Sequence, residues 1–286
     1  SHLGTNTSKN ITGVGFAPDL SISINRQQSI GQSPIVFDRL RGPDKPLYTG
    51  ATSAEITVSN VLTSFNQDGV TVYDPSGYGT NYTTNGSYYV NWFFKRTPGV
   101  FDTVCYTGTG IARTINHALG VAPELMFVKN RTGAYDWTVY VGTASNYMVL
   151  NSTAAKTTGG YWNSALATNS VFSVSTQSYV NKNNATYVAY LFATKAGISK
   201  VGSYIGNGSN QTINCGFTTG ARFILIKRTD STGDWYVWDT TRGIITGNDP
   251  HLSLNTTTAE VTTDDSIDPD NSGFIILYSF QMEHIE

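Results

Sequence analysis

Short apolar runs alternate with polar turns along the whole chain, and one stretch shows the pattern clearly. Residues 222–227 form an apolar run, and an aromatic run follows at residues 235–238. An Asp-x-x-Arg-Gly motif at Asp239, Arg242 and Gly243 comes directly afterwards. Runs this short, bounded by Gly-, Asp- and Thr-rich segments, are typical of β-strands joined by turns. The stretch therefore predicts two strands and a structured corner.

The same pattern occurs three times. Its copies start at Gly15, Gly120 and Gly216, with offsets of 105 and 96 residues. A second Asp-x-x-Arg-Gly corner begins at Asp38, 201 residues before Asp239, and this distance equals the two offsets together. Because independent landmarks agree, we interpret the chain as an internal repeat of about 100 residues, the size of a small β-domain.

Each copy contains several short strands with turns between them. This pattern predicts an all-β fold of tandem antiparallel β-sandwich modules. We expect the modules at residues 1–106, 107–205 and 206–286, because short Gly-rich joints follow residues 106 and 205. These joints are too short to act as free linkers, so neighbouring modules are expected to touch.

The third copy looks incomplete. Aromatic strands at residues 89–94 and 187–192 close the first two copies, and a strand at residues 201–205 is expected to lead into the third. By the same register, the closing strand of the third copy belongs near residue 283. Either a compressed strand at residues 278–284 fills this place, or a sheet edge stays open for another chain.

Composition narrows the class of protein. Charged residues make up 13% of the chain, compared with roughly 25% in typical soluble domains, and the net charge is −2. A chain without a basic stripe is not expected to bind nucleic acid. Its apolar runs are shorter than the about 18 residues of a membrane span, and its start does not read as a signal peptide. Cys105 and Cys215 occupy different places in the repeat, which favours two free thiols over a disulfide.

Motifs for catalysis are mostly missing from the sequence. The motifs of zinc proteases, P-loop enzymes and serine hydrolases do not occur, and the four histidines do not recur between the copies. Glu55 and Glu260 occupy similar places in the first and third copies, which favours a structural role. We therefore expect a protein that is not an enzyme and needs no cofactor, although a pair of aspartates across a joint stays open as an alternative.

Two sets of charged residues have both structural and functional interpretations. Asp268, Asp270 and Ser272 fit the opening of a calcium loop, but Ser279 stands where such a loop needs a glutamate. In the repeat register this segment matches plain turns, so a turn is favoured over a calcium site. The Asp-Arg pairs of the two corners are expected to be local ion pairs, since the second copy lacks both charges near Gly142.

Aromatic residues are the best candidates for recognition, because aromatic rings stack on sugar faces. Aromatic residues at repeated positions or within apolar strands, namely Trp92, Trp137, Tyr190 and Trp235, are expected in the core. Long Gly-rich segments that do not repeat carry others. We expect these to be exposed and to bind a ligand; they are Tyr78, Tyr82, Tyr161 and Trp162.

These landmarks resemble a β-repeat of tail-fibre and other structural proteins of tailed bacteriophages, especially marine and cyanobacterial ones. The resemblance covers nearly the whole chain and is weakest in the first copy. It implies lectin-like, jelly-roll-like β-sandwich modules, a place in the virion tail, and no catalytic residue. The matching segments are residues 120–131, 150–155, 187–193, 200–208 and 226–235.

The function expected from this resemblance is that of a tail-fibre or adhesin fragment. Its exposed loops would bind host-surface glycan or lipopolysaccharide, and its partners would be other tail proteins and two further copies in a homotrimer. Weak sites present in many copies gain strength through avidity. The alternatives are a purely structural spacer of the tail and a glycan-depolymerising enzyme.

Overall fold

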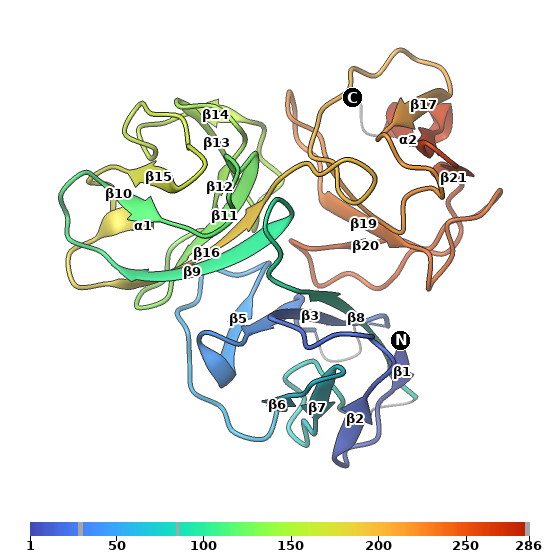
Figure 1. Cartoon of the computed structure of the whole chain (residues 1–286). Coiled ribbons are helices and arrows are strands. Elements are labelled where there is room, and N and C mark those ends of the chain that lie inside the picture. The colour runs from blue at the N-terminus through green and yellow to red at the C-terminus, as the bar shows by residue number, and fades with distance from the viewer. Residues whose placement is uncertain (28–30, 84–85, 284–286) are drawn as a thin grey trace.

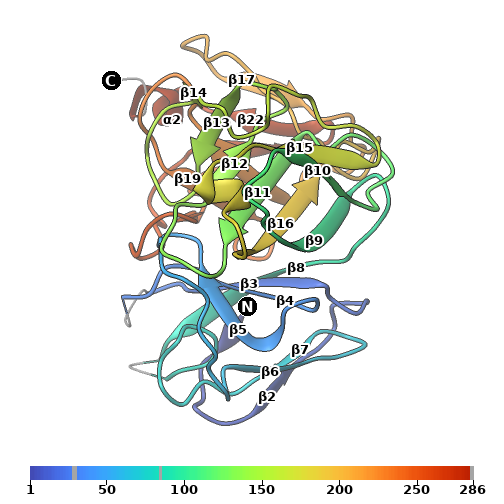
Figure 2. The same cartoon turned by 90° about the vertical axis from the view of Figure 1, so that its left-hand side faces the viewer.

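The computed structural model describes residues 1–27, 31–83 and 86–283. It confirms the all-β prediction, because nearly every element is a strand and every strand pair is antiparallel. Three lobes surround a common centre (Figure 1), and the view turned by 90° separates the first lobe from the other two (Figure 2). We call these lobes the first, second and third modules.

Each module is built from two antiparallel sheets. We call the sheet that faces the other modules the larger one, although both sheets of the third module have three strands. The first module contains β1 (His2–Leu3), β2 (Lys9–Ile11), β3 (Leu20–Asn25), β4 (Ile35–Asp38), β5 (Gly42–Tyr48), β6 (Leu62–Phe65), β7 (Val70–Val72) and β8 (Tyr88–Phe94). Its larger sheet has the order β1-β8-β3-β4-β5, and its smaller sheet has the order β2-β7-β6. The two sheets enclose a small core of their own.

The second module follows the same plan. Its elements are β9 (Phe101–Thr107), β10 (Arg113–Asn116), β11 (Leu125–Asn130), β12 (Thr138–Tyr140), β13 (Asn146–Val149), β14 (Thr157–Thr158), β15 (Val171–Val174), α1 (Ser178–Asn181) and β16 (Thr186–Phe192). The larger sheet is ordered β14-β13-β12-β11-β16-β9, and the smaller sheet consists of β10 and β15 alone.

The third module has two three-stranded sheets, ordered β18-β19-β20 and β17-β22-β21. Its elements are β17 (Gln211–Asn214), β18 (Phe223–Lys227), β19 (Trp235–Asp239), β20 (Leu252–Ser253), β21 (Ile267–Asp270), β22 (Gly273–Ile276) and α2 (Tyr278–Glu283). The compressed strand considered for residues 278–284 is therefore wrong where the structure describes it, because helix α2 lies there. His284 lies outside the described residues.

Strand pairing gives the register between modules. Ile22 pairs with Val36, Phe127 with Val139, and Leu225 with Val237. By this register β3, β11 and β18 are equivalent, as are β4, β12 and β19. The closing strands β8 and β16 pair with β3 and β11 in the same way.

The larger sheets bury both of their faces. One face packs on the smaller sheet of its own module, and the other meets the larger sheets of the two other modules in a shared central core. All of β3 is buried for this reason, including Ser21 and Ser23. The aromatic residues expected in the core are confirmed there: Trp92, Trp137, Tyr190 and Trp235 all belong to the central core.

Three equivalent backbone hydrogen bonds connect the modules in a ring. In each, an N–H group from one module donates to a carbonyl of the next, and the third module returns to the first. The three bonds are Glu55 N to Arg131 O (2.9 Å), Lys156 N to Thr229 O (2.9 Å) and Glu260 N to Arg26 O (2.7 Å). The expected contact between neighbouring modules is thus confirmed, and it extends to the two modules at opposite ends of the chain.

Two expectations about strands need correction. The boundary placed after residue 106 cuts through β9, which pairs with β16 over its whole length and so belongs to the second module. Residues 201–205, expected to be a strand, form none. Residues 103–107 of β9 are their counterparts, and the strand that would pair with residues 201–205 is not present in the described part of the third module.

Candidate functional site

Trp162 is not the exposed loop residue that the sequence predicts. Its side chain is 1% exposed and lies in the inner core of the second module. The indole N–H donates to the carbonyl of Asn146 at 3.0 Å, and the ring meets Tyr140 edge to face. The smaller sheet of this module has two strands where the others have three, and Trp162 belongs to the core that this sheet helps to cover.

Tyr78 and Tyr82 are half-buried and belong to the first module, so the structure does not bring them together with Tyr161. Tyr78 packs against the inner core of its own module. The buried carboxylate of Asp74 accepts the backbone N–H of Tyr78 at 2.7 Å, and this bond fixes the loop. The backbone carbonyl of Tyr82 accepts the hydroxyl of Tyr89 at 2.9 Å.

Tyr161 is part of a group of four tyrosines on the surface of the second module. Its ring lies 4.4 Å from that of Tyr147 and 5.6 Å from that of Tyr179, both at steep angles. Tyr179 in turn meets Tyr135 edge to face at 5.3 Å. All four side chains are half-buried, so each ring keeps part of its surface in solvent. We call these four residues the tyrosine cluster.

Four separate segments supply the cluster. Tyr135 lies in the turn between β11 and β12, Tyr147 on β13, Tyr161 in the loop after β14 and Tyr179 on α1. Gly159 is required beside them, because a Cβ atom there would lie 2.5 Å from the ring of Tyr147. Only Tyr161 of these four residues was predicted from the sequence. The other three could have been found by the same signal, because none has a tyrosine at the matching place in the other copies.

The cluster combines neutral hydroxyls with one positive charge. Burial, together with neighbouring Tyr147, raises the pKa of Tyr161, so this phenol keeps its proton at physiological pH. The ammonium of the exposed Lys182 lies 5.7 Å from the centroid of Tyr135 and donates a hydrogen bond to its hydroxyl at 3.4 Å. The arrangement offers ring faces, hydroxyl groups and a cation to a polar ligand.

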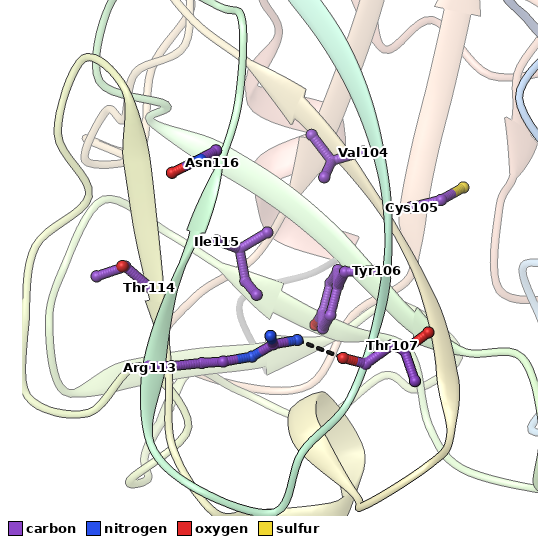
Figure 3. Close-up of a pocket in the computed structure, with 8 residues that line it drawn as sticks. All are labelled: Val104, Cys105, Tyr106, Thr107, Arg113, Thr114, Ile115 and Asn116. Carbon is purple, nitrogen blue, oxygen red and sulfur yellow. Dashed lines mark hydrogen bonds between the residues drawn. The ribbon is translucent and has the colours of Figure 1, made fainter.

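A groove of about 430 Å³ opens between β9 and β10 (Figure 3). Val104, Tyr106 and Ile115 point into the space between the two strands, whereas Cys105 points away from it (Figure 3). The ring of Tyr106 stacks on Tyr187 at 5.0 Å.

Helix α1 links the groove to the tyrosine cluster. The hydroxyl of Tyr106 donates to the carbonyl of Val180 at 2.7 Å, and Val180 directly follows the cluster residue Tyr179. On the groove side, the guanidinium of Arg113 lies 6.0 Å from the Tyr106 ring and donates to the carbonyl of Thr107 (Figure 3). Helix α1 thus contacts both the groove and the cluster, although β9 and β13 lie near opposite edges of the larger sheet.

A repeated motif lines the outer strand of this groove. Thr114, Ile115 and Asn116 of β10 recur as residues 212–214 of β17, with Ile115 paired to Phe172 and the equivalent isoleucine paired to Phe274. The threonine and asparagine are exposed in both copies. Sequence reasoning missed this motif, although its offset of 98 residues agrees with other landmarks.

The Asp-Arg corners are buried ion pairs, as expected, and they also join modules. Asp38 and Arg41 form one pair, and both hydrogen-bond the hydroxyl of Tyr190 in the second module. Arg41 also binds Glu55, which Arg131 of the second module holds from the other side at 2.8 Å. Burial alone raises the pKa of Glu55, but the hydrogen bonds from both arginines outweigh it and lower the pKa.

The third module repeats this network against the first. Asp239 pairs with Arg242 at 2.6 Å and accepts the indole N–H of Trp92 at 2.9 Å. Glu260 lies between Arg242 and Arg26 of the first module. These charged side chains are paired with one another at the contacts between modules, which supports the structural role expected for Glu55 and Glu260.

The remaining candidates are also in structural positions. Asp268 and Asp270 lie on β21 of a β21–β22 hairpin, and the carboxylate of Asp270 accepts bonds from the backbone and hydroxyl of Ser272. Within the described residues no group of three His, Cys, Asp or Glu side chains could hold a metal ion. Cys105 and Cys215 are free thiols, as predicted.

A family model described as a domain of unknown function, DUF7483, matches residues 1–281. The chain belongs to this family. Because the match spans all three modules, the DUF7483 domain corresponds to the whole ring and not to one sandwich. No curated protein and no solved structure matched the chain. Within the described residues no helix has the length and apolar character to cross a membrane.

Proposed function

We propose that this DUF7483 chain is a non-catalytic part of a bacteriophage tail fibre or tail adhesin that attaches to host-surface glycan. The observation that carries the proposal is the tyrosine cluster, where four half-buried rings lie on one surface beside the positive charge of Lys182. Aromatic rings with polar tips bind the apolar faces of sugars while their hydroxyls and nearby amides bond sugar hydroxyls. The virion location and the phage partners rest on the resemblance in the sequence.

The groove between β9 and β10 offers a second contact for the same class of ligand. Exposed Thr114 and Asn116 offer hydrogen-bonding groups along its outer strand. Lys182 and Arg113 add positive charge, which suits the phosphate groups of a lipopolysaccharide core. A site this open binds each sugar weakly, so we propose that attachment depends on several copies acting together, as in a homotrimeric fibre.

Binding to host lipopolysaccharide and to arrayed glycans tests this proposal, with the protein displayed on multivalent beads. Tyr135→Ala and Tyr179→Ala each remove a ring of the cluster, and each is expected to weaken binding about fivefold or more, since a stacking contact is worth about 1 kcal/mol. Tyr88→Ala is the matched control, because Tyr88 is 46% exposed in the first module, outside the cluster. Binding that falls equally in all three variants, or in none, counts against the site.

A purely structural spacer is the second candidate. The buried ion pairs between modules favour it, because they make the ring rigid and leave few charges for a ligand. Absence of glycan binding at high valency would support the spacer over the adhesin. If the protein released reducing ends from host polysaccharide, it would be an enzyme, and the proposed non-catalytic role would be wrong.

A further inference from the structure

Strand β18 has one open edge. Its equivalents are paired on both sides: β3 pairs with β4 and β8, and β11 pairs with β12 and β16. Strand β18 pairs with β19 alone within the described residues. The backbone groups on its other side therefore form a row of donors and acceptors without a strand partner.

The burial of β18 differs from that of its equivalents for this reason. Every residue of β3 is buried, and so is every residue of β11 except Leu125. In β18 only Ile224 is buried. Phe223 and Leu225 pack against the central core but stay partly uncovered. An apolar strand at the core of a module is thus left half-open on the side where β8 and β16 lie in the other modules.

A second segment shows the same deficiency independently. The bridges Thr97–Phe101 and Lys195–Ser199 are equivalent, and they place residues 201–205 in register with residues 103–107 of β9. In the second module β9 pairs with β16 along its whole length. Residues 201–205 have no such strand to pair with, and Ile205 is 87% exposed. One absent strand explains both the half-open β18 and the unpaired residues 201–205.

We infer that the open edge of β18 binds an extended, mainly apolar segment from outside residues 1–286, which completes the β18-β19-β20 sheet of the third module. The repeat itself indicates the chemistry of this segment: β8 and β16 carry apolar and aromatic residues over most of their length, and both face the central core. Backbone hydrogen bonds to β18 supply affinity, and alternate side chains supply specificity, as in strand addition to other sheet edges.

One position of the incoming strand differs from the pattern of β8 and β16. Tyr190 and Trp92 are equivalent residues of those strands, and each donates a hydrogen bond to a corner aspartate of a neighbouring module. Val141 stands in the second module where those aspartates stand, and it packs against the central core. The residue of the incoming strand that faces Val141 should therefore be purely apolar, such as leucine, because a buried hydroxyl or indole N–H would lack its acceptor.

The test uses the unaltered protein and three synthetic peptides flanked by lysines for solubility. The first peptide carries the β16 sequence with Tyr190→Leu. The second has the same sequence, with methyl groups on the amide nitrogens equivalent to those that β16 directs at β11. The third has the same composition in scrambled order. Hydrogen exchange followed by mass spectrometry locates binding, and fluorescence anisotropy measures affinity. Since the protein is the same in every arm, misfolding of a variant cannot produce the result.

The first peptide is expected to slow exchange in β18 and in residues 201–205, with β11 unchanged as the internal control. Methylation is expected to weaken binding about tenfold or more, because it removes several backbone hydrogen bonds. No protection of β18 at millimolar peptide, or equal affinity of the methylated or scrambled peptide, would overturn the inference. Protection of β18 that rises with protein concentration in the absence of peptide would assign the edge to a second copy and overturn the proposed occupant. None of these results depends on glycan binding.

Discussion

Two equivalent lysines at the module contacts allow a matched test of how the ring is held together. Lys129 of β11 is fully buried, and its ammonium donates to the carbonyls of Thr52 (3.0 Å), Asn130 (2.9 Å) and Tyr135 (2.8 Å). Thr52 belongs to the first module, so this side chain bridges two modules. Lys227 of β18 makes the equivalent bridge, but it is only half-buried and has two carbonyl acceptors, those of Thr153 and Arg228.

The structure gives the size of the expected effects. Lys129→Met leaves three carbonyls without the ammonium, at about 1–3 kcal/mol for each unsatisfied buried group. Part of this loss is recovered, because burial lowers the pKa of Lys129 to about 8, and relieving that desolvation returns about 3 kcal/mol. The net loss of unfolding free energy is then about 3 kcal/mol. Lys227→Met leaves carbonyls closer to solvent and should cost about 1 kcal/mol.

Urea unfolding at pH 7, followed by tryptophan fluorescence, measures both variants against the parent chain. The pH dependence provides a second readout. A lysine pKa lowered from 10.5 to about 8 means that the unfolded chain holds more protons between these values, so unfolding free energy rises with pH across this window. Lys129→Met should reduce that rise and leave the part that comes from Lys227, because burial lowers the pKa of Lys227 to about 8 as well. Equal losses in the two variants, or a Lys129→Met protein as stable as the parent, would refute the reasoning.

Three further predictions follow from the described contacts. Burial raises the pKa of Asp249 to about 6, so the folded chain binds more protons than the unfolded chain between pH 4 and 6. The free energy of unfolding should therefore fall as the pH rises through this range. Thermal melts of Asp249→Asn should not show this fall. Tyr190→Phe removes the hydroxyl that donates to Asp38, and urea unfolding should report a loss of about 1–3 kcal/mol, with unchanged stability arguing against the bridge. Millimolar calcium should leave the melting temperature unchanged, because the β21–β22 hairpin is a plain turn; an upward shift would restore the calcium site.

The repeat in the sequence predicts the strands well, because most of them depend on local pattern. Residues 222–227 and 235–238 are strands β18 and β19 to within one residue at either end. Trp137 and Trp235 recur at one repeat position, and both are buried in the central core. A side chain that keeps its place in two copies belongs to the scaffold, so the repeated positions predict burial.

The errors concern contacts between distant segments. Residues 201–205 carry a strand-like pattern, but a strand forms only where a partner lies beside it, and local pattern does not contain that information. Trp162 is buried because its ring packs against Tyr140 and its indole N–H bonds the carbonyl of Asn146, and the loop sequence does not contain these contacts. The tyrosine cluster assembles from four segments spread between residues 135 and 179, and spacing along the chain does not reveal that they meet.

The closure of the ring has a consequence for biosynthesis. The contact between Arg26 and Glu260 joins residues 234 positions apart, and that between Trp92 and Asp239 joins residues 147 positions apart. A chain leaves the ribosome from its N-terminus, so the first module emerges long before the surface that covers its core face. The part of its central face that the third module covers stays in solvent until that module has been made. Chaperone demand during translation should therefore peak before residue 260 emerges, and fall abruptly once the last partner of the first module is available.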